Sequence, residues 1–359
     1  MTDYLYLENV TKAFGKVVAV DGVTLGIGKT EFFALLGPSG CGKTTTLRLI
    51  AGLEQPTAGR IYIDGREVTN LPPQERDVAM VFQDYALYPH MTLFENIAYP
   101  LKVRKVPKKQ ITEKVHEVAE HLMITELLDR LPSQVSGGQQ QRAAVARALV
   151  HAPKVFLFDE PLSNLDAKLR IEARAFLKHL QKEIHVTTVY VTHDQAEAMA
   201  MADRIGVMFA GKVVQVGAPL DLYRVPKTKE VAAFLGNPPM NILSGRVQPS
   251  VDGIQFVGEG FVLPLPGLHI PPQEAYLGFR PEHAKIAIEP GDCAIRGRIY
   301  AVQPLGSEIW VTLQVGSTTV TVKTFAEEMP EAAEEVWLVL NPQKIHLFDS
   351  AGRRVPLAG

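Results

Sequence analysis

The tripeptide Gly-Lys-Thr occurs twice near the N-terminus, and only one copy has the spacing of a phosphate-binding loop. Such a loop has the form G-x-x-x-x-G-K-[ST] and lies between a strand and a helix. Residues 37–44, GPSGCGKT, fit this form in full, whereas the copy at residues 28–30 would need a glycine in place of Val23. The apolar run EFFALL precedes the complete copy, and TTLRLIAGL follows it with helical spacing. We therefore predict a phosphate loop at 37–44 and a turn between two strands at 28–30.

Each residue type in this loop has a chemical use. Glycines let backbone N–H groups curl around phosphate oxygens, and the following helix adds the positive end of its dipole. Lys43 would reach the β- and γ-phosphates, while the Thr44 hydroxyl would bind Mg²⁺. We expect ATP to contact the loop residues Gly37, Pro38, Ser39, Gly40, Cys41, Gly42, Lys43, Thr44 and Thr45.

Two adjacent carboxylates, Asp159 and Glu160, end a second apolar run, KVFLFDEP. Carboxylates at the C-terminal edge of a parallel strand lie where ligands bind in such sheets. Asp159 suits Mg²⁺ coordination, which leaves Glu160 free to polarise a water molecule. The alternative is a solvent-exposed acidic turn, which we would favour if the phosphate loop were absent.

The stretch VSGGQQQR at 135–142 opens a predicted helix. Ser136, Gly137 and Gly138 offer a hydroxyl and free N–H groups at its N-terminus, which makes a second anion site. One ATP does not need two such sites, but two ATPs shared between two subunits do. Taken alone, the stretch is better explained as an ordinary helix cap with glycines.

Composition and charge limit the class of protein. The chain has 359 residues, 46% of them hydrophobic and 21% charged, with a net charge of −2, which is typical of globular proteins and gives no nucleic-acid footprint. No apolar stretch reaches the roughly 20 residues that span a bilayer. The two cysteines, Cys41 and Cys293, suit a reducing cytosol. Any action at a membrane would therefore pass through a partner.

The pattern of elements predicts two domains. Residues 1–235 alternate apolar strand-like runs with helices, which predicts an α/β domain with a mostly parallel sheet. Within it, residues 84–153 are largely helical and form a candidate subdomain. Residues 236–359 contain short Val-, Ile- and Thr-rich runs broken by Gly, Pro and Asn, which predicts an all-β domain, a small barrel.

Together these motifs resemble the ATP-binding subunits of ABC transporters over essentially the whole chain. GPSGCGKT is similar to the Walker A loop, KVFLFDE to the Walker B strand, SGGQQQR to the signature motif and SNLD, at 163–166, to the D-loop. VFQDYALYPHMT resembles the Q-loop segment with Gln83 as its glutamine, and VTHD resembles the switch with His193 as its histidine. Phe14 matches the aromatic residue that stacks on adenine.

The resemblance implies a site shared between two copies of the chain. Lys43, Gln83, Glu160 and His193 would act in ATP hydrolysis, and Thr44, Gln83 and Asp159 would organise Mg²⁺. The partner copy would contact the same nucleotide through Ser136, Gly137, Gly138, Gln139 and Asp166. Hydrolysis would drive two transmembrane permeases, fed by an extracytoplasmic solute-binding protein, with this subunit peripheral on the cytoplasmic side of the membrane. The helical region around 84–130 would be the docking surface.

The tail narrows the resemblance to sugar importers of the maltose, multiple-sugar and glycerol-phosphate group. GNPPMN at 236–241 and GFRPEH at 278–283 resemble the regulatory OB-like (TOBE) β domain of that group. Polyamine, iron, sulfate and molybdate importers carry related tails and remain alternatives, and soluble ABC proteins of DNA repair or translation are a more distant one. An ATP sensor without hydrolysis is disfavoured by the presence of Glu160 and His193.

Three positions depart from the family pattern. The signature begins with Val135 in place of leucine, and Phe279 stands where isoleucine is commoner. Thr30 occupies a turn position that is usually glycine, which would cost roughly 1–2 kcal/mol if the turn needs a positive φ.

Overall fold

The computed structural model describes residues 3–268, 270–326 and 334–357. The chain divides into two compact units, Met1–Leu220 and Asp221–Gly359. The predicted boundary, at residue 235, lies within the second unit. Residues 221–235 therefore belong to the β unit, where Ala232 packs with Met240 and Phe348 in a small apolar cluster.

The first unit contains a six-stranded sheet in the order β10-β9-β3-β8-β7-β6. Its strands are β3 (Phe32–Leu36), β6 (Val78–Val81), β7 (Val155–Asp159), β8 (Thr187–Thr192), β9 (Arg204–Phe209) and β10 (Lys212–Gly217). All neighbours pair in parallel except β10, which is antiparallel to β9. The strands β3, β7 and β8 are buried over their whole length, which explains the continuous apolar runs FFALL in β3 and VFLF in β7.

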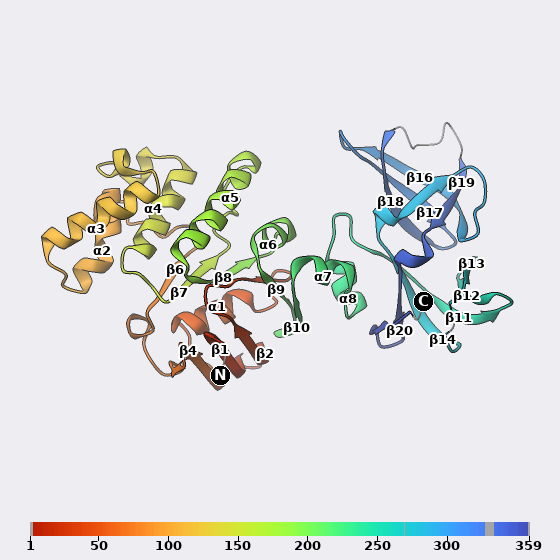
Figure 1. Ribbon diagram of the computed structural model, residues 1–359, viewed down its shortest axis with the longest axis horizontal. Helices are drawn as coiled ribbons and strands as arrows, with labels where there is room; N and C mark the ends of the chain where they lie inside the picture. Colours follow the sequence, from red (N-terminus) through yellow and green to blue (C-terminus); the bar gives the residue numbers. More distant parts are fainter. Residues whose placement is uncertain (1–2, 269, 327–333, 358–359) are drawn as a thin grey trace. The chain divides into compact units, whose positions relative to one another are not determined.

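A second sheet, which the sequence analysis does not predict, precedes and flanks the phosphate loop. It is antiparallel, in the order β2-β1-β4-β5, with bounds β1 (Leu5–Phe14), β2 (Val17–Ile27), β4 (Ala58–Ile63) and β5 (Arg66–Glu67). Its inward-facing residues, such as Leu7 and Ile61, share one core with Leu47 and Ile50 of the first helix. Figure 1 shows this sheet below the helix.

Helices supply the rest of the first unit. They are α1 (Lys43–Ala51), α2 (Leu93–Val103), α3 (Lys108–His121), α4 (Gly137–Leu149), α5 (Ala167–Ile184) and α6 (Gln195–Met201). Helices α2, α3 and α4 pack on one another and account for the predicted helical region at 84–153 (Figure 1). Val135, the departure at the start of the signature, packs against their apolar core.

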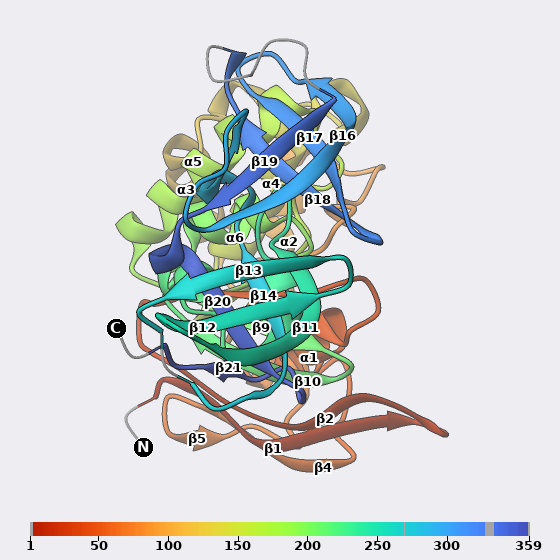
Figure 2. The ribbon, with the colours of Figure 1, turned by 90° about the vertical axis from the view of Figure 1, so that its right-hand side faces the viewer.

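The second unit is all-β apart from two short helices, α7 (Pro219–Arg224), which starts at the junction, and α8 (Lys229–Phe234). One antiparallel sheet has the order β13-β12-β11-β14-β20-β21 and the other β15-β19-β16-β17-β18. Figure 2 shows the two sheets of this unit face on. The bounds of the first are β11 (Asn241–Ser250), β12 (Gly253–Gly258), β13 (Phe261–Pro266), β14 (Gln273–Phe279), β20 (Ile345–Asp349) and β21 (Arg354–Val355). Those of the second are β15 (Ala284–Ala287), β16 (Ala294–Pro304), β17 (Ile309–Val315), β18 (Thr318–Thr324) and β19 (Glu335–Leu340).

The tail motifs GNPPMN and GFRPEH meet inside this unit, where Asn241 of β11 pairs with Phe279 of β14. Arg280 is fully buried, and its guanidinium donates 2.7 Å to the Tyr223 carbonyl, donates to the Leu235 carbonyl and stacks 3.8 Å over the Tyr223 ring. Glu282 accepts a hydrogen bond from the Tyr223 hydroxyl. Phe279 is buried in the β core, as expected for that position. The GFRPEH motif thus fastens α7 and α8 to the β domain.

Candidate nucleotide-binding and catalytic site

The loop at residues 37–44 joins the end of β3 to the start of α1, as predicted. Gly42 has φ 107° and ends the loop immediately before α1. A Cβ at Gly42 would lie 2.2 Å from the Ala19 carbonyl oxygen, and one at Gly37 would lie 2.2 Å from the Met208 carbonyl oxygen. Both positions therefore require glycine, because backbone from other strands approaches too closely for any side chain.

Lys43 folds back over this loop and is only 4% exposed. Its Nζ donates 2.8 Å to the Gly37 carbonyl and 3.0 Å to the Pro38 carbonyl. Burial raises the pKa of the neighbouring Cys41 thiol, which keeps that residue protonated. The loop therefore holds a buried cation, together with the first amides of α1, in a setting that favours an anion.

Thr44 and Asp159 meet across the sheet although 115 positions separate them. The Thr44 hydroxyl donates 2.8 Å to Oδ1 of Asp159, which ends β7. Burial raises the pKa of Asp159, and the hydrogen bond from Thr44 opposes that rise. A hydroxyl and a carboxylate are hard oxygen donors that suit Mg²⁺, which commonly takes one or two carboxylates and fills its remaining positions with water and phosphate. The pair fits this ion, and no cluster of three or more acidic, His or Cys ligands occurs among the described residues.

Glu160 and His193 form the second pair at the same edge. Nδ1 of His193 lies 2.8 Å from Oε2 of Glu160. They are adjacent because β7 and β8 are parallel neighbours, and the Glu160 amide donates 3.0 Å to the carbonyl of Val191, the penultimate residue of β8. Glu160 has φ 46°, an unusual conformation for a non-glycine residue that recurs at functional sites. The side chains of both residues retain solvent access, so the pair can reach a ligand.

Gln83 and Phe14 both have exposed side chains. Gln83 follows β6, the parallel neighbour of β7; its side chain is exposed, and its carbonyl accepts 3.0 Å from the Asn164 amide. Phe14 ends β1 and is 48% exposed, with Nζ of Lys12 lying 4.8 Å from its ring centroid. An exposed ring beside a cation is available for stacking.

The signature residues lie elsewhere in the unit. Ser136 caps α4 in a reciprocal capping box, accepting from the Gln139 amide while its own amide donates 2.9 Å to the Gln139 side chain. Ser136, Gly138 and Gln139 line a cavity of about 270 Å³ with residues of α5. Asp166 caps α5, accepting 2.9 Å from the Leu169 amide. Figures 1 and 2 both show α4 well separated from α1, so one chain brings together the loop, Asp159, Glu160 and His193 but not the signature.

Two polar residues near these groups, one buried and one half-buried, were not predicted from the sequence. Glu197, in α6, is 3% exposed and accepts hydrogen bonds from two hydroxyls. Arg147, in α4, donates 2.8 Å to the Tyr85 carbonyl and 2.6 Å to the Ala86 carbonyl, in the segment that follows Gln83. A lone charge inside an apolar helical run, as in QAEAMAMA and VARALV, is the sequence signal that could have identified both.

Three family models match successive parts of the chain. Residues 20–163 match the ABC transporter model, residues 236–284 the MalK OB fold domain and residues 277–348 the TOBE domain. No helix among the described residues is long and apolar enough to cross a membrane.

Relatives match the chain over nearly its whole length. It is 49% identical to the trehalose/maltose import ATP-binding protein MalK of Thermococcus litoralis, with 96% of each chain covered. It is 46% identical to the sn-glycerol-3-phosphate import ATP-binding protein UgpC of Pectobacterium atrosepticum, covering 96% of this chain and 97% of the relative. The sulfoquinovosyl glycerol transport ATP-binding protein SmoE of Agrobacterium fabrum is 44% identical, with 97% and 98% covered.

Among solved structures, the first unit resembles the ATP-binding cassette MJ0796 in a dimeric post-hydrolysis state bound to ADP and Pi. The TM-score is 0.54 at 34% identity, covering 60% of this chain and 98% of that one. The phosphate loop, the Glu160–His193 pair and these matches agree. The chain belongs to the ATP-binding subunits of ABC importers, in the group that contains the MalK, UgpC and SmoE proteins, and is an ATPase.

Proposed function

We propose that two copies of this chain bind Mg-ATP between them and use its hydrolysis to drive import of a sugar or a glycerol-phosphate-like solute through two permease subunits. The observation that carries the catalytic part is the 2.8 Å contact between Glu160 and His193, beside the Thr44–Asp159 pair. These four side chains converge from the ends of β7 and β8 and from the start of α1, at one edge of the sheet.

The residues divide the work of hydrolysis. Phe14 stacks on the adenine, while Lys43 and the loop amides hold the phosphates. Thr44, Asp159 and Gln83 would hold Mg²⁺, which would neutralise phosphate charge. Glu160 orients the attacking water and accepts its proton, and His193 contacts the γ-phosphate and stabilises the charge that develops there.

Dimerisation completes the site from the second copy. Ser136, Gly137, Gly138 and Gln139 stand at the N-terminus of a 13-residue helix, which favours an anion. Their separation from the loop of their own chain supports a role toward the nucleotide of the partner copy. MJ0796, which is similar to the first unit, has been solved as a dimer.

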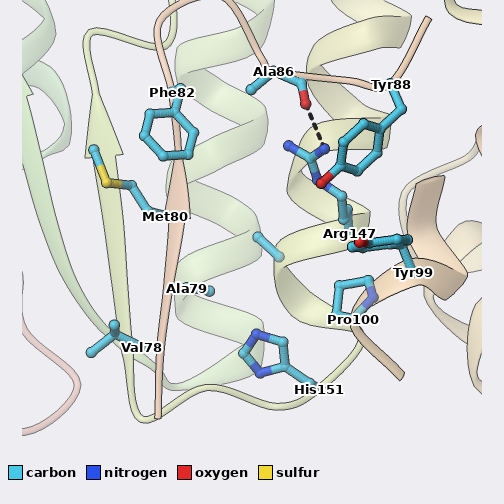
Figure 3. A pocket seen from close by; sticks show the side chains of 11 residues that line it. Val78, Ala79, Met80, Phe82, Ala86, Tyr88, Tyr99, Pro100, Arg147 and His151 are labelled. Atoms are coloured by element: carbon cyan, nitrogen blue, oxygen red, sulfur yellow. Dashed lines mark hydrogen bonds between the residues drawn. The ribbon is translucent and has the colours of Figure 1, made fainter. Parts of the chain in front are cut away.

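A groove between β6, α2 and α4 is the proposed docking surface for the permeases. The groove has a volume of about 300 Å³. Figure 3 shows Arg147 beside the Tyr88 ring, with its hydrogen bond to Ala86 drawn. Tyr85 and Ala86 both have positive φ, and the Arg147 guanidinium donates a hydrogen bond to the carbonyl of each. Because this strained segment directly follows Gln83, a change at the nucleotide can alter the shape of the groove.

The solute assignment rests on the relatives and on the tail. MalK, UgpC and SmoE are named for trehalose/maltose, glycerol-3-phosphate and sulfoquinovosyl glycerol, all of them polyhydroxylated. Their shared chemistry supports a sugar or polyol-phosphate solute for this chain, delivered by a solute-binding protein on the far side of the membrane. The subunit would then lie on the cytoplasmic face.

Substitution of Glu160 by Gln tests the catalytic proposal. Gln keeps the shape but loses the charge, so ATP binding should persist while turnover falls by about 100-fold or more. Gel filtration with ATP should show a stable dimer for Glu160→Gln. A variant that stays monomeric when the wild type dimerises, or that turns over at a near-normal rate, contradicts the proposal.

The solute class has its own test in membrane vesicles containing the complete transporter. ATPase activity should rise with a binding protein loaded with an oligosaccharide or a glycerol phosphate. Stimulation only by a binding protein loaded with spermidine, ferric ion or sulfate would overturn the solute class while leaving the importer role intact.

A further inference from the structure

Glu197 lies directly behind the switch segment that carries His193. Its carboxylate is 3% exposed, and Oε2 accepts 2.7 Å from the Thr192 hydroxyl and 2.9 Å from the Tyr190 hydroxyl. It shares a cavity of about 110 Å³ with Glu160, Thr192 and His193. Burying a carboxylate is costly unless it is hydrogen-bonded, so its retention here points to a specific use.

The Thr192 hydroxyl connects Glu197 to both sides of His193. It accepts 2.9 Å from the backbone N–H of Asp194, so its single proton is committed to Glu197. Thr192 and Asp194 are the chain neighbours of His193, whose own side chain is about half exposed. The direction of the His193 ring therefore depends on how firmly these two neighbours are held.

A second set of contacts joins the same point to α5. Nε of Arg170 lies 4.0 Å from Oε1 of Glu197, and its Nη1 lies 3.6 Å from Oδ2 of Asp194. Arg174 donates 3.2 Å to the same Asp194 oxygen. Arg170 also donates 3.1 Å to the Leu165 carbonyl, in the segment that precedes α5. One carboxylate oxygen of Glu197 thus faces the switch and the other faces α5.

We propose that Glu197 is a positioning residue that holds Thr192 and Asp194 so that His193 faces Glu160. This inference rests on the proposed function of Glu160 and His193. An amide does not reproduce both faces of the carboxylate, because only one of its two ends is an acceptor. In the Glu197→Gln variant the NH₂ group would point either at the hydroxyls of Thr192 and Tyr190 or at the N–H of Arg170.

The central experiment is a double-mutant cycle on the full chain, with ATPase kinetics as the readout. Glu197→Gln should lower kcat by about 10- to 100-fold, because a small misplacement of a catalytic group has that effect, while KM for ATP stays within about threefold. In a His193→Ala background the same substitution should cause no further loss. Equal losses in both backgrounds would overturn the proposal, since Glu197 would then act independently of His193.

Thr192 provides a second test that does not depend on Glu197→Gln folding. Thr192→Val removes the hydroxyl at constant shape and should lower kcat as Glu197→Gln does, whereas Thr192→Ser keeps the hydroxyl and should restore most of the rate. Tyr190→Phe removes the other donor, leaves the switch link intact and should stay within about threefold of wild type. Equal activity of the Val and Ser variants would overturn the proposal. If His193→Ala alone keeps wild-type kcat, the proposed role of His193 is wrong, which is a separate outcome.

Discussion

The Thr44 hydroxyl donates a 2.8 Å hydrogen bond to the Asp159 carboxylate, joining the start of α1 to the end of β7. This contact brings together the two residues that we propose hold Mg²⁺. Thr44 and Asp159 would hold the ion through these two oxygens, and the ion would neutralise phosphate charge there.

Asp159→Asn should weaken Mg²⁺ binding, measured through the Mg²⁺ dependence of ATPase activity. The amide keeps the shape but loses the charge, so the Mg²⁺ concentration for half-maximal activity should rise more than tenfold. Asp64→Asn is a matched control, because Asp64 is a surface partner of Lys154 at 2.8 Å. An unchanged Mg²⁺ titration for Asp159→Asn would remove this residue from the metal site.

The two Gly-Lys-Thr copies should respond differently to substitution of their lysines. Lys43 is buried within the phosphate loop, whereas Nζ of Lys29 lies 5.7 Å from the Tyr4 ring centroid in a turn between strands. Lys43→Ala should nearly abolish tight ATP binding, measured by titration with a fluorescent ATP analogue. Lys29→Ala should leave the dissociation constant within about threefold. Comparable losses would show that the loop assignment is wrong.

Thr30 occupies a left-handed conformation with φ 62°. Tertiary contacts impose it, because the Thr30 amide donates 2.9 Å to the Thr187 hydroxyl and its carbonyl accepts 2.7 Å from Gln181. Thr30→Gly should therefore stabilise the first unit by about 0.5 to 1 kcal/mol. This is the free energy gained by relieving backbone strain, minus the entropic cost of ordering a glycine on folding. Thr30→Ala is the control and should bring no such gain, because a Cβ remains.

The measurement for Thr30 is urea unfolding followed by circular dichroism at 222 nm, since most described helices belong to the first unit. Equal stabilisation by Gly and Ala would mean that the hydroxyl, and not the backbone conformation, is unfavourable there.

His346 should make the β unit sensitive to acid. Burial, with help from Arg354, Arg280 and His283, lowers the pKa of this imidazole to about 4. The folded state holds His346 neutral while the unfolded chain takes up a proton below about pH 6.5. The free energy of unfolding should therefore be unaffected above that pH and fall as the pH drops from 6.5 to 4, by at most about 3 kcal/mol.

His346→Gln should flatten this part of the pH profile. Both tryptophans, Trp310 and Trp337, lie in the second unit, so their fluorescence during urea unfolding reports on that unit alone. His179→Gln is the control, because that side chain is largely exposed on α5 in the first unit. A profile unchanged by His346→Gln would show that this imidazole does not resist protonation in the fold.

Local sequence was sufficient to predict those features whose chemistry depends on neighbours in the chain. The phosphate loop, the strand that ends in Asp159 and Glu160, and the cap at Ser136 were all predicted at their observed positions. Glycine spacing, continuous apolar runs and capping residues act within about ten positions, so they can be recognised from order alone.

Only the tertiary structure decided which of these pieces meet. The parallel order β3-β8-β7 places His193 on Glu160 and brings Thr44, at the start of α1, to Asp159. The signature helix lies on a different part of the unit. Packing likewise determines the antiparallel sheet β2-β1-β4-β5, the inclusion of α8 in the β unit and the burial of Glu197. Strand neighbours and buried hydrogen bonds are chosen by burial across the whole fold, which local spacing does not encode.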